Sequence, residues 1–373
     1  MKILVQTPDY PDSKRENFAF VKQLVDEMAL QGHSLQVVAP YCVSHNKRFY
    51  KKIEVVKMGK GIIRVYRPHY ISFSNLVVKG FRPSDWAFKC AMERGLRMIE
   101  EKPDVIYGHF WSTAFYGYKF AEANNIPLFV ASGESEIDFR NNSTKRQGFC
   151  DYVSGVICVS TKNLEESIRL NLTTREKCAI FPNAIDASFF RRHDKVSCRT
   201  RLGIPQGIFI ACFLGWFNER KGSERLSQAI SKIRDGKKIY SFFIGEGPLS
   251  PTCSNILFEG KLPHNQIPEY LNAADIFVLP TLQEGCCNAI IEAMACGLPI
   301  VSSNMPFNWD VLDSSNSIMV DPYNTDEIAD AIRKLRDDKD LLTNLSLGAL
   351  KKAEELTIDN RAKNILGFMA QKM

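Results

Sequence analysis

The sequence contains no apolar run long enough to cross a membrane. A transmembrane helix needs roughly 18 or more consecutive apolar residues, and no window of the 373 residues approaches that length. The N-terminus also has no apolar stretch of the length found in signal peptides. These absences exclude an integral membrane protein and predict that the chain is cytoplasmic.

The spacings typical of metal sites, disulfides and dinucleotide sites are also missing. The eleven cysteines are scattered, odd in number and often placed inside apolar runs such as 157–159, which predicts buried, reduced thiols. Cys286 and Cys287 are adjacent, but no second cysteine pair or nearby histidine completes a set of metal ligands. The loop after the first strand lacks G-x-G-x-x-G, which argues against a nicotinamide or flavin dinucleotide there. We expect no metal ion and no cofactor.

Acidic residues are scarce between Tyr41 and Tyr70. The formal net charge of the chain is +6, and this stretch holds eight cations against the single acid Glu54. Such a run fits contact with an anionic membrane surface or an anionic acceptor, and a solvated basic hairpin accounts for it equally well. Nucleic acid is not expected as a partner, because no recognisable binding motif accompanies the run. The cations are Lys47, Arg48, Lys51, Lys52, Lys57, Lys60, Arg64 and Arg67.

The length and the apolar pattern predict two α/β domains. A chain of 373 residues exceeds the usual size of one core, so two domains of about 150 to 200 residues are expected. Residues 1–6 form an apolar strand pattern, and the apolar residues of 18–28 recur at helical spacing. Gly32 ends that helix before a second strand at 35–39. The same alternation begins again with a strand at 208–214.

A further strand–helix–strand unit lies in the second half. Asp275–Pro280 is a short apolar run typical of a buried parallel strand. Residues 289–295 favour a helix that Asn288 caps and Gly297 ends, and 298–303 is the next apolar run. In such a unit the N-terminus of the helix presents free N–H groups beside the end of the strand. An anion such as a diphosphate fits there.

Two carboxylates flank the start of this helix. Glu284 precedes the helix in the loop and Glu292 lies about one turn inside it, so a directly paired acid and base is not expected. Each can accept hydrogen bonds from hydroxyl groups, and two such acceptors on either side of a phosphate site fit a nucleotide sugar. The alternative is that Glu284 is a simple turn residue and Glu292 a solvated helix residue.

The stretch 275–302 resembles the donor site of a known enzyme family. Its pattern E-x7-E, followed by Ala-Met-Ala-Cys-Gly-Leu-Pro-Ile-Val, is similar to the signature of the retaining GT-B glycosyltransferases of family 4. The resemblance implies an α/β chain with the GT-B fold, in which two Rossmann-like domains face each other across a cleft. We place an acceptor-binding domain at 1–172, a linker near 170–180 and a nucleotide-sugar-binding domain at 178–355. The last helix, about 358–373, is expected to cross back to the N-terminal domain.

The resemblance also implies roles in donor binding. Lys221 would bind the donor diphosphate and stabilise it as it leaves, and Arg220 would replace an arginine that relatives carry where this chain has Trp216. Glu284 would bind hydroxyls of the donor sugar, and Glu292 would bind those of the ribose. The other expected donor-binding residues are Gly285, Cys286, Cys287 and Asn288 at the helix start, Gly245 after the strand 240–244, and Leu262 near the nucleobase.

In the first half the resemblance is looser. His109 ends an apolar strand at the position of a family histidine near the transferred sugar, although a lone histidine in an apolar run is as often structural. Glu134, after the strand 127–133, is a candidate for orienting an acceptor hydroxyl, with Glu136 as the alternative. The first loop lacks the Gly-Gly pair of relatives and carries Lys14 and Arg15 instead. These two cations are candidates for binding an acceptor phosphate, and solvation explains them equally well.

The resemblance implies a metal-independent, retaining glycosyltransferase. Its donor would be a nucleotide sugar, with a UDP-sugar favoured over a GDP-sugar. Its acceptor would be a saccharide or a lipid-linked saccharide in surface polysaccharide or glycoconjugate synthesis. The expected location is cytoplasmic, with peripheral contact with the inner face of the plasma membrane. Two alternatives stay open: a nucleotide-sugar-binding subunit without catalysis, and a GT-B sugar-nucleotide epimerase.

Overall fold

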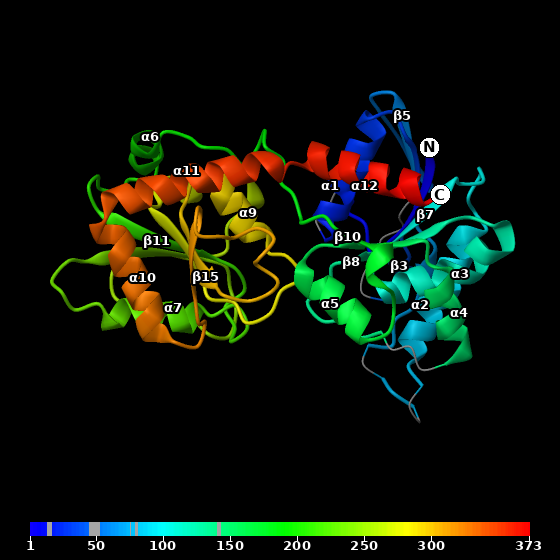
Figure 1. Cartoon of the computed structure of the whole chain (residues 1–373), viewed down its shortest axis with the longest axis horizontal. Helices are drawn as coiled ribbons and strands as arrows, with labels where there is room; N and C mark the ends of the chain where they lie inside the picture. The colour runs from blue at the N-terminus through cyan, green and yellow to red at the C-terminus, as the bar shows by residue number, and fades with distance from the viewer. Residues whose placement is uncertain (13–16, 45–52, 75, 79–80, 140–142) are drawn as a thin grey trace. The chain divides into compact units, whose positions relative to one another are not determined.

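The computed structural model describes residues 1–12, 17–44, 53–74, 76–78, 81–139 and 143–373 of the chain. They form two compact units, which Figure 1 shows in colours that follow the chain. The first unit comprises Met1–Phe181 together with Arg361–Met373, and the second comprises Pro182–Asn360.

An eight-stranded sheet forms the centre of the first unit. Its strands are β1 (Lys2–Gln6), β2 (Ser34–Val38), β4 (Ile53–Met58), β5 (Gly61–Tyr66), β7 (Val105–His109), β8 (Leu128–Ser132), β9 (Gly155–Cys158) and β10 (Cys178–Ile180). Their order in the sheet is β10-β9-β8-β7-β1-β2-β5-β4. The paired strands run parallel except for β4, which is antiparallel to β5 at the edge. The order of strands along the chain reverses between β1 and β7, and ligands bind at such a point in doubly wound sheets.

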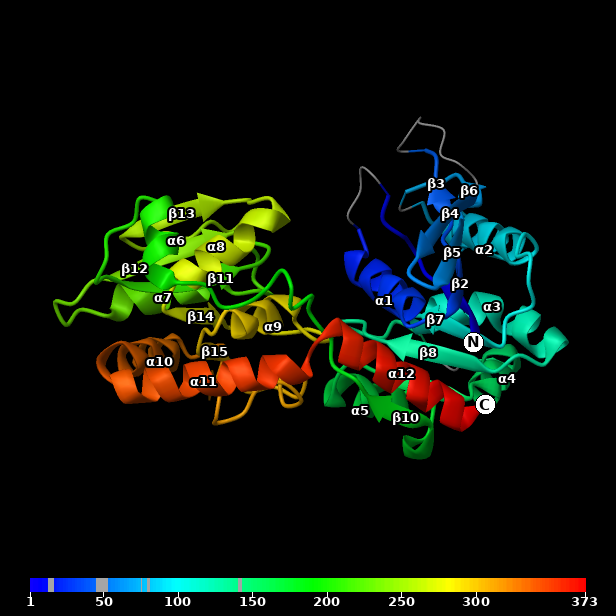
Figure 2. The same ribbon diagram turned by 90° about the horizontal axis from the view of Figure 1, so that it is seen from above.

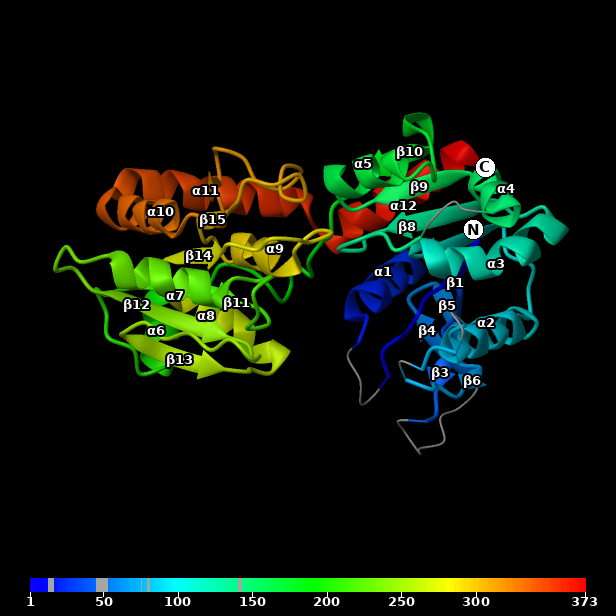
Figure 3. The same cartoon turned by 90° about the horizontal axis from the view of Figure 1, so that it is seen from below.

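Helices cover both faces of this sheet, as a parallel sheet requires. Leu128 and Val130 of β8 belong to a core cluster with residues of the helices at 83–96, 111–124 and 144–152. Phe129 points to the opposite face, where its ring centroid lies 6.0 Å from that of Phe368. Figure 1 shows the two helix layers, and Figures 2 and 3 show them from above and below. The helices are α1 (Ala19–Leu30), α2 (Pro83–Leu96), α3 (Trp111–Asn124), α4 (Thr144–Tyr152), α5 (Thr161–Arg169) and α12 (Ile358–Lys372).

The second unit has a six-stranded parallel sheet in the order β13-β12-β11-β14-β15-β16. These strands are β11 (Phe209–Leu214), β12 (Ile239–Ile244), β13 (Ile256–Gly260), β14 (Ile276–Leu279), β15 (Ile300–Ser303) and β16 (Ser317–Val320). In chain order this is 3-2-1-4-5-6, the arrangement of a doubly wound Rossmann-like sheet. The expected strands at 208–214, 275–280 and 298–303 are therefore confirmed as β11, β14 and β15. The switch point of the sheet lies between β11 and β14.

Two helix layers also enclose the second sheet. The helices are α6 (Lys195–Arg201), α7 (Ser223–Lys232), α8 (Ile267–Ala273), α9 (Asn288–Ala295), α10 (Thr325–Asp337) and α11 (Lys339–Glu355). On one face α7 packs against α10, and on the other α9 packs against α11. Figure 1 shows α9 and α11 above the strands and α7 and α10 below them.

The division between the units falls after Phe181, close to the segment 170–180 in which we expect the linker. The chain returns to the first unit at Arg361, within α12, close to the expected start of the last segment at 358. There Arg361 donates a hydrogen bond to the carbonyl oxygen of Phe181, and the ring centroid of Phe368 lies 5.9 Å from that of Phe181. Residues far apart in the sequence thus complete one unit.

The two ends of α9 differ from each other in how well the sequence predicts them. Gly297 adopts a φ of +80° directly after the helix, and Leu298 N–H donates to Ala293 at 3.0 Å, which is the expected glycine stop. The expected cap at Asn288 is wrong. Asn288 is the first helical residue, the preceding Cys287 has no side-chain capping bond, and the Asn288 side-chain oxygen accepts a hydrogen bond from Asn183 instead, at 2.8 Å.

Glycine at position 245 allows the loops after β11 and β12 to touch. Gly245 has a φ of +147°, and a Cβ atom built there would lie 1.9 Å from the carbonyl oxygen of Gly215. Such a contact is far too short, so only glycine fits. We expected this glycine to allow the close approach of a ligand. The structure shows that the chain's own backbone makes the close approach.

We predict that Gly245→Ala lowers the free energy of unfolding of the second unit by about 3 kcal/mol or more, because the Cβ atom must displace backbone. Gly236→Ala is the matched control: Gly236 has a φ of +81°, and no atom of the described residues lies within 4 Å of an added Cβ. Only the strain of the left-handed backbone then remains, about 1 to 2 kcal/mol. Urea denaturation measures both, and equal losses would contradict the proposed contact.

Candidate functional site

Two loops meet at the switch point of the second unit. Residues 215–222 connect β11 to α7, and residues 280–287 connect β14 to α9. We call them the switch-point loops. A backbone hydrogen bond from Leu282 N–H to the Arg220 carbonyl oxygen, 2.8 Å long, ties them together. The side-chain oxygen of Asn218 accepts the N–H of Lys221 at 2.9 Å, which fixes the turn that presents the two cations.

Glu284 gathers both cations around one of its oxygens. Its Oε1 accepts a hydrogen bond from the Thr281 hydroxyl at 2.8 Å and lies 3.0 Å from Arg220 Nη1 and 2.6 Å from Lys221 Nζ. Arg220 Nη1 also donates to the Gln283 carbonyl oxygen at 2.7 Å. Within the described part of the chain, Glu284 Oε2 has no hydrogen-bond partner. We call Thr281, Arg220, Lys221 and Glu284 the Glu284 cluster. It offers a net positive charge and one uncommitted carboxylate oxygen.

Lys221 is the buried member of this cluster. Burial alone would lower the pKa of its ammonium group, but the nearby Cys287 sulfur and the Glu284 carboxylate favour the charged form, and the pKa is raised overall. Cys287 Sγ lies 3.8 Å from Lys221 Nζ. Burial raises the pKa of the Cys287 thiol, so this thiol is neutral at pH 7 and the carboxylate is the group that holds the charge of Lys221 there.

The segment 285–288 forms the start of α9 beside the Glu284 cluster. Gly285, Cys286 and Cys287 are buried, and Asn288 is half-buried. Asn183 holds this segment in place, because its side-chain nitrogen donates to the Cys286 carbonyl oxygen at 3.0 Å and to Asn288 Oδ1 at 2.8 Å. Sequence reasoning did not assign Asn183 a role. The only signal for it was a Pro-Asn pair at 182–183.

Glu292 lies apart from the Glu284 cluster. Its Oε1 is 3.7 Å from His264 Nε2, and the His264 ring stacks on Phe189 with centroids 5.4 Å apart. The two carboxylates therefore have separate partners and do not form an acid–base pair with each other. A hydroxyl acceptor next to a stacked pair of rings fits the sugar and base part of a nucleoside.

Three further expected features lie at the carboxyl ends of the strands of the second sheet. The Trp216 side chain, at the position where the resemblance implies an arginine, is half exposed. Gly245 follows β12 and contacts Gly215 in the first switch-point loop. Leu262 is half-buried just after β13. The expected donor-binding residues thus follow the carboxyl ends of β11, β12, β13 and β14.

His109 ends β7 at the switch point of the first unit. It is 5% exposed, and neither ring nitrogen has a hydrogen-bond partner among the residues that the structure describes. The ring lies among Phe18, Phe20 and Phe110, with a shortest centroid distance of 4.4 Å to Phe110. Burial, and then the charge of Arg361, lower its pKa to about 3. His109 is consequently neutral near pH 7 and cannot act as a proton donor of ordinary strength there.

Glu134 has a structural role that differs from the expected one. Its Oε1 accepts the N–H of Trp111 at 3.0 Å, and its Oε2 accepts the N–H of Gly133 at 2.9 Å and the hydroxyl of Ser132 at 3.2 Å. Burial raises the pKa of this carboxyl although these hydrogen bonds favour its charged form. Glu134 satisfies the first N–H of α3, and its role in orienting an acceptor hydroxyl stays a prediction. Lys14 and Arg15 lie outside the described residues.

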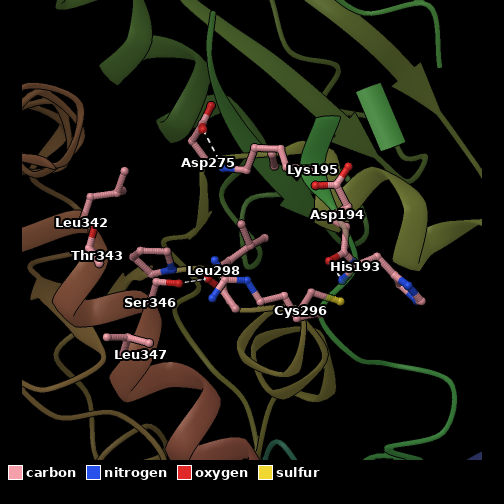
Figure 4. Close-up of a pocket in the computed structure, with 15 residues that line it drawn as sticks. His193, Asp194, Lys195, Asp275, Cys296, Leu298, Leu342, Thr343, Ser346 and Leu347 are labelled. Atoms are coloured by element: carbon pink, nitrogen blue, oxygen red, sulfur yellow. Dashed lines mark hydrogen bonds and ion pairs between the residues drawn. The ribbon is translucent and has the colours of Figure 1, made fainter. Parts of the chain in front are cut away.

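A cavity of about 330 Å³ lies at the other end of the strands of the second sheet, next to the amino ends of β14 and β15. Figure 4 shows Lys195 and Asp275 joined across it, with Nζ and Oδ1 2.8 Å apart. Asp275 also binds Arg199 at 2.8 Å, so its charge is already balanced. Ligands of doubly wound sheets bind at the carboxyl ends of the strands. The cavity is therefore distinct from the switch-point site.

Comparison with known protein families gives two matches. Residues 19–189 match the family described as Glycosyltransferase Family 4, and residues 209–338 match the family described as Glycosyl transferases group 1. A Bacillus subtilis (strain 168) protein that carries the name of a teichuronic acid biosynthesis glycosyltransferase, TuaC, is 28% identical over 353 residues. That alignment covers 90% of this chain and 89% of the relative.

Solved structures of similar fold include a sucrose-phosphate synthase from Thermosynechococcus elongatus. It has a TM-score of 0.76 and 17% identity, and the match covers 99% of this chain and 98% of that one. The Anabaena protein Alr3699/HepE, solved in complex with UDP-glucose, has a TM-score of 0.68 and 14% identity, with full coverage of both chains. These similarities show that the chain has the GT-B fold, with two Rossmann-like domains.

We predict that Glu284→Gln lowers the pKa of Lys221 below its usual range, because burial then acts on the ammonium without an opposing charge. Titration of the lysine side chains by NMR, with Lys221 assigned from Lys221→Arg, measures the shift. Glu246→Gln is the control, since Glu246 pairs with Lys261 at 3.0 Å. An unchanged Lys221 pKa in Glu284→Gln would show that Glu284 does not hold this charge.

The buried His109 generates a prediction for stability against pH. The pKa of His109 is about 3 in the folded chain and 6.5 in the unfolded chain. Between these pH values the unfolded chain therefore binds a proton at His109 and the folded chain does not. Stability is complete above pH 6.5 and falls as the pH approaches 3, by about 1.4 kcal/mol per pH unit. Urea denaturation of the wild type and of His109→Phe between these limits should show a steeper loss in the wild type. Parallel curves would refute the assignment.

Proposed function

The chain belongs to the glycosyltransferases of family 4 and group 1, and from this membership we propose that it is a retaining hexosyltransferase with a nucleotide-sugar donor. The Glu284 cluster at the switch point of the second unit carries the proposal. Two cations and a helix N-terminus meet there, which is the chemistry that binds a diphosphate.

The donor that we propose is a UDP-sugar. Lys221 and Arg220 bind the diphosphate, and the N–H groups at Gly285–Asn288 add a positive dipole end. Glu292, next to the stacked His264 and Phe189 rings, accepts the ribose hydroxyls. The similar Anabaena structure, which holds UDP-glucose, supports uridine as the base.

Glu284 has two functions in this proposal. Its Oε1 holds Lys221 and Arg220 side by side against their mutual repulsion, at 2.6 and 3.0 Å. Its Oε2, which has no partner among the described residues, accepts hydroxyls of the donor sugar. One side chain thereby helps to position both the diphosphate, which is the leaving group, and the donor sugar, which is transferred.

The proposed reaction retains the configuration of the anomeric carbon. The bond between this carbon and the diphosphate oxygen breaks, while the acceptor hydroxyl oxygen forms a new bond on the same face. The acceptor proton passes to the departing diphosphate oxygen, so no separate base is needed. Lys221 and Arg220 stabilise the negative charge that develops on the diphosphate, and we propose that they do so without a metal ion.

The acceptor that we propose is a saccharide or lipid-linked saccharide in polysaccharide synthesis. The similarity to a protein named for teichuronic acid biosynthesis supports this class. In the first unit, the two ring nitrogens of His109 have no partner within the described ranges, which supports a role in hydrogen bonding to a saccharide hydroxyl. Because its imidazole is neutral, it would act as a hydrogen-bonding group and not as a cation.

We predict that Lys221→Ala lowers turnover by about 10² to 10³, the usual effect of losing one preorganised charge donor in the transition state. Release of UDP from a UDP-sugar by the purified protein measures it, with water or a saccharide as acceptor. Lys232→Ala is the control, because Lys232 pairs with Asp326 on the surface at 2.8 Å and should not affect turnover. Unchanged turnover of Lys221→Ala would remove Lys221 from the reaction.

The same assay separates the two alternative functions. A binding subunit would bind the UDP-sugar saturably, seen as a rise in thermal stability, and would release no UDP. An epimerase acting on the intact nucleotide sugar would change the sugar and leave it attached to UDP. An inverted anomeric centre in the product, seen by NMR, would overturn the retaining mechanism alone.

A further inference from the structure

A cluster of exposed apolar side chains lies in the first unit, between the strand at 69–70 and α2. Among the described residues seventeen large apolar side chains are exposed, and seven of them fall within the sixteen positions 71–86. Single exposed apolar residues are common, but a cluster of this kind marks an interaction site. Its members, each between 48% and 56% exposed, are Ile71, Phe73, Leu76, Val77, Val78, Phe81 and Trp86. We call them the apolar segment.

The apolar segment is anchored at its base. β6 (His69–Tyr70) pairs in parallel with β3 (Tyr41–Cys42), and β6 leads directly into the segment. The hydroxyl of Ser84, in the first turn of α2, accepts the Phe73 N–H at 2.9 Å and donates to the Ser74 carbonyl oxygen at 3.1 Å. In Figure 1 the segment, in light blue, extends away from the sheet of the first unit.

The outer part of the segment satisfies some of its own backbone. Val78 and Phe81 exchange two hydrogen bonds, each 2.9 Å long. A backbone that enters an apolar medium must satisfy its N–H and C=O groups internally. The exchange lowers the cost of placing Val78 and Phe81 in such a medium.

The charge around the apolar segment favours an anionic partner. From Met28 to Ser84 the sequence holds one acid, Glu54, against ten lysines and arginines. Arg82 is exposed beside Phe81, and its side chain makes no hydrogen bond or ion pair with the described residues. Not every cation is available, because Arg67 is buried and donates to two carbonyl oxygens. Arg64 pairs with Glu100 at 3.2 Å.

We propose that the apolar segment inserts into the interface of an anionic lipid bilayer. Phe73, Phe81 and Trp86 supply the aromatic rings that favour the interface. Arg82 faces the lipid phosphates, and leucine and valine enter the acyl boundary. Within the described ranges no helix has both the length and the apolar character that crossing a bilayer demands, and this contact needs none.

A second copy of the chain is the less suitable occupant. A stable protein interface buries more than about 1,000 Å² of complementary surface, and a single protruding segment offers little of it. A bilayer surrounds a protrusion from all sides and buries each apolar side chain. The excess of cations would also repel the same surface of a second copy.

The experiment measures how the full chain partitions onto vesicles. We expect binding to vesicles of equimolar phosphatidylcholine and phosphatidylglycerol and much weaker binding to pure phosphatidylcholine, with added salt reducing the difference. The double variant Leu76→Ser/Phe81→Ser should lower the partition coefficient on the mixed vesicles about tenfold or more. Arg82→Gln should weaken binding to the mixed vesicles and leave binding to pure phosphatidylcholine unchanged.

The matched control is Val196→Ser/Leu347→Ser, which removes two side chains that are 57% and 55% exposed in the second unit. Its partition coefficient should equal that of the wild type. Lipids with brominated tails should quench the fluorescence of Trp86, and Trp86→Phe should lose that part of the quenching. Equal binding by the Leu76→Ser/Phe81→Ser variant and the wild type, or no quenching assigned to Trp86, would overturn the proposal. A change in oligomeric mass instead of vesicle binding would assign the segment to a second copy.

This test is independent of the proposed reaction. The vesicle assay contains no nucleotide sugar, so a chain that binds vesicles but releases no UDP would keep the membrane contact and lose the transferase function. A chain that releases UDP but ignores vesicles would do the reverse. Circular dichroism of each variant shows that the first unit is folded before the partition coefficients are compared.

Discussion

The site of the second unit depends on the nearly buried pair of Lys221 and Glu284. Removing such charges from water costs several kcal/mol each, and the cost is offset only when each charge finds a partner of good geometry. Here the carboxylate oxygen receives Lys221, Arg220 and Thr281 together, at 2.6 to 3.0 Å. The pair also joins the loop after β11 to the loop after β14 across the switch point. Two adjacent cations that would repel each other are thereby held ready for a larger anion.

Much of this arrangement is predictable from local sequence. The apolar strands, the helix between Glu284 and Gly297 and the glycine stop follow from periodicity and from the left-handed backbone that only glycine adopts easily. The errors arise where a residue distant in the sequence is the hydrogen-bond partner of a polar side chain. Asn288 does not cap α9 because Asn183, 105 positions earlier, donates to its side chain. Glu134 accepts the N–H of Trp111, 23 positions earlier, a partner that its local sequence does not reveal. A polar side chain reveals its type in the sequence, but its partner is set by the fold.

Trp216 and Arg220 lie in the same loop and differ in where they point. Trp216, which is half exposed, stands where the family resemblance implies an arginine. Four positions later, Arg220 reaches the Glu284 oxygen from the same loop and is fixed by the Gln283 carbonyl oxygen. The loop is the element that delivers charge to the switch point, and its turn brings position 220 there. In the function that we propose, Arg220 takes the place of that arginine, so two cations face the diphosphate.

The surface of the first unit has exposed apolar residues that the average composition of the chain does not reveal. A mean hydropathy of −0.18 and a net charge of +6 describe an ordinary globular chain, because averages mix buried and exposed residues. The basic run at 41–70 suggests a membrane, yet two of its cations, Arg64 and Arg67, have partners inside the protein. The structure points instead to the residues just after that run, where the apolar side chains remain in water. Their exposure costs free energy in water, and a bilayer interface is the environment that would recover it.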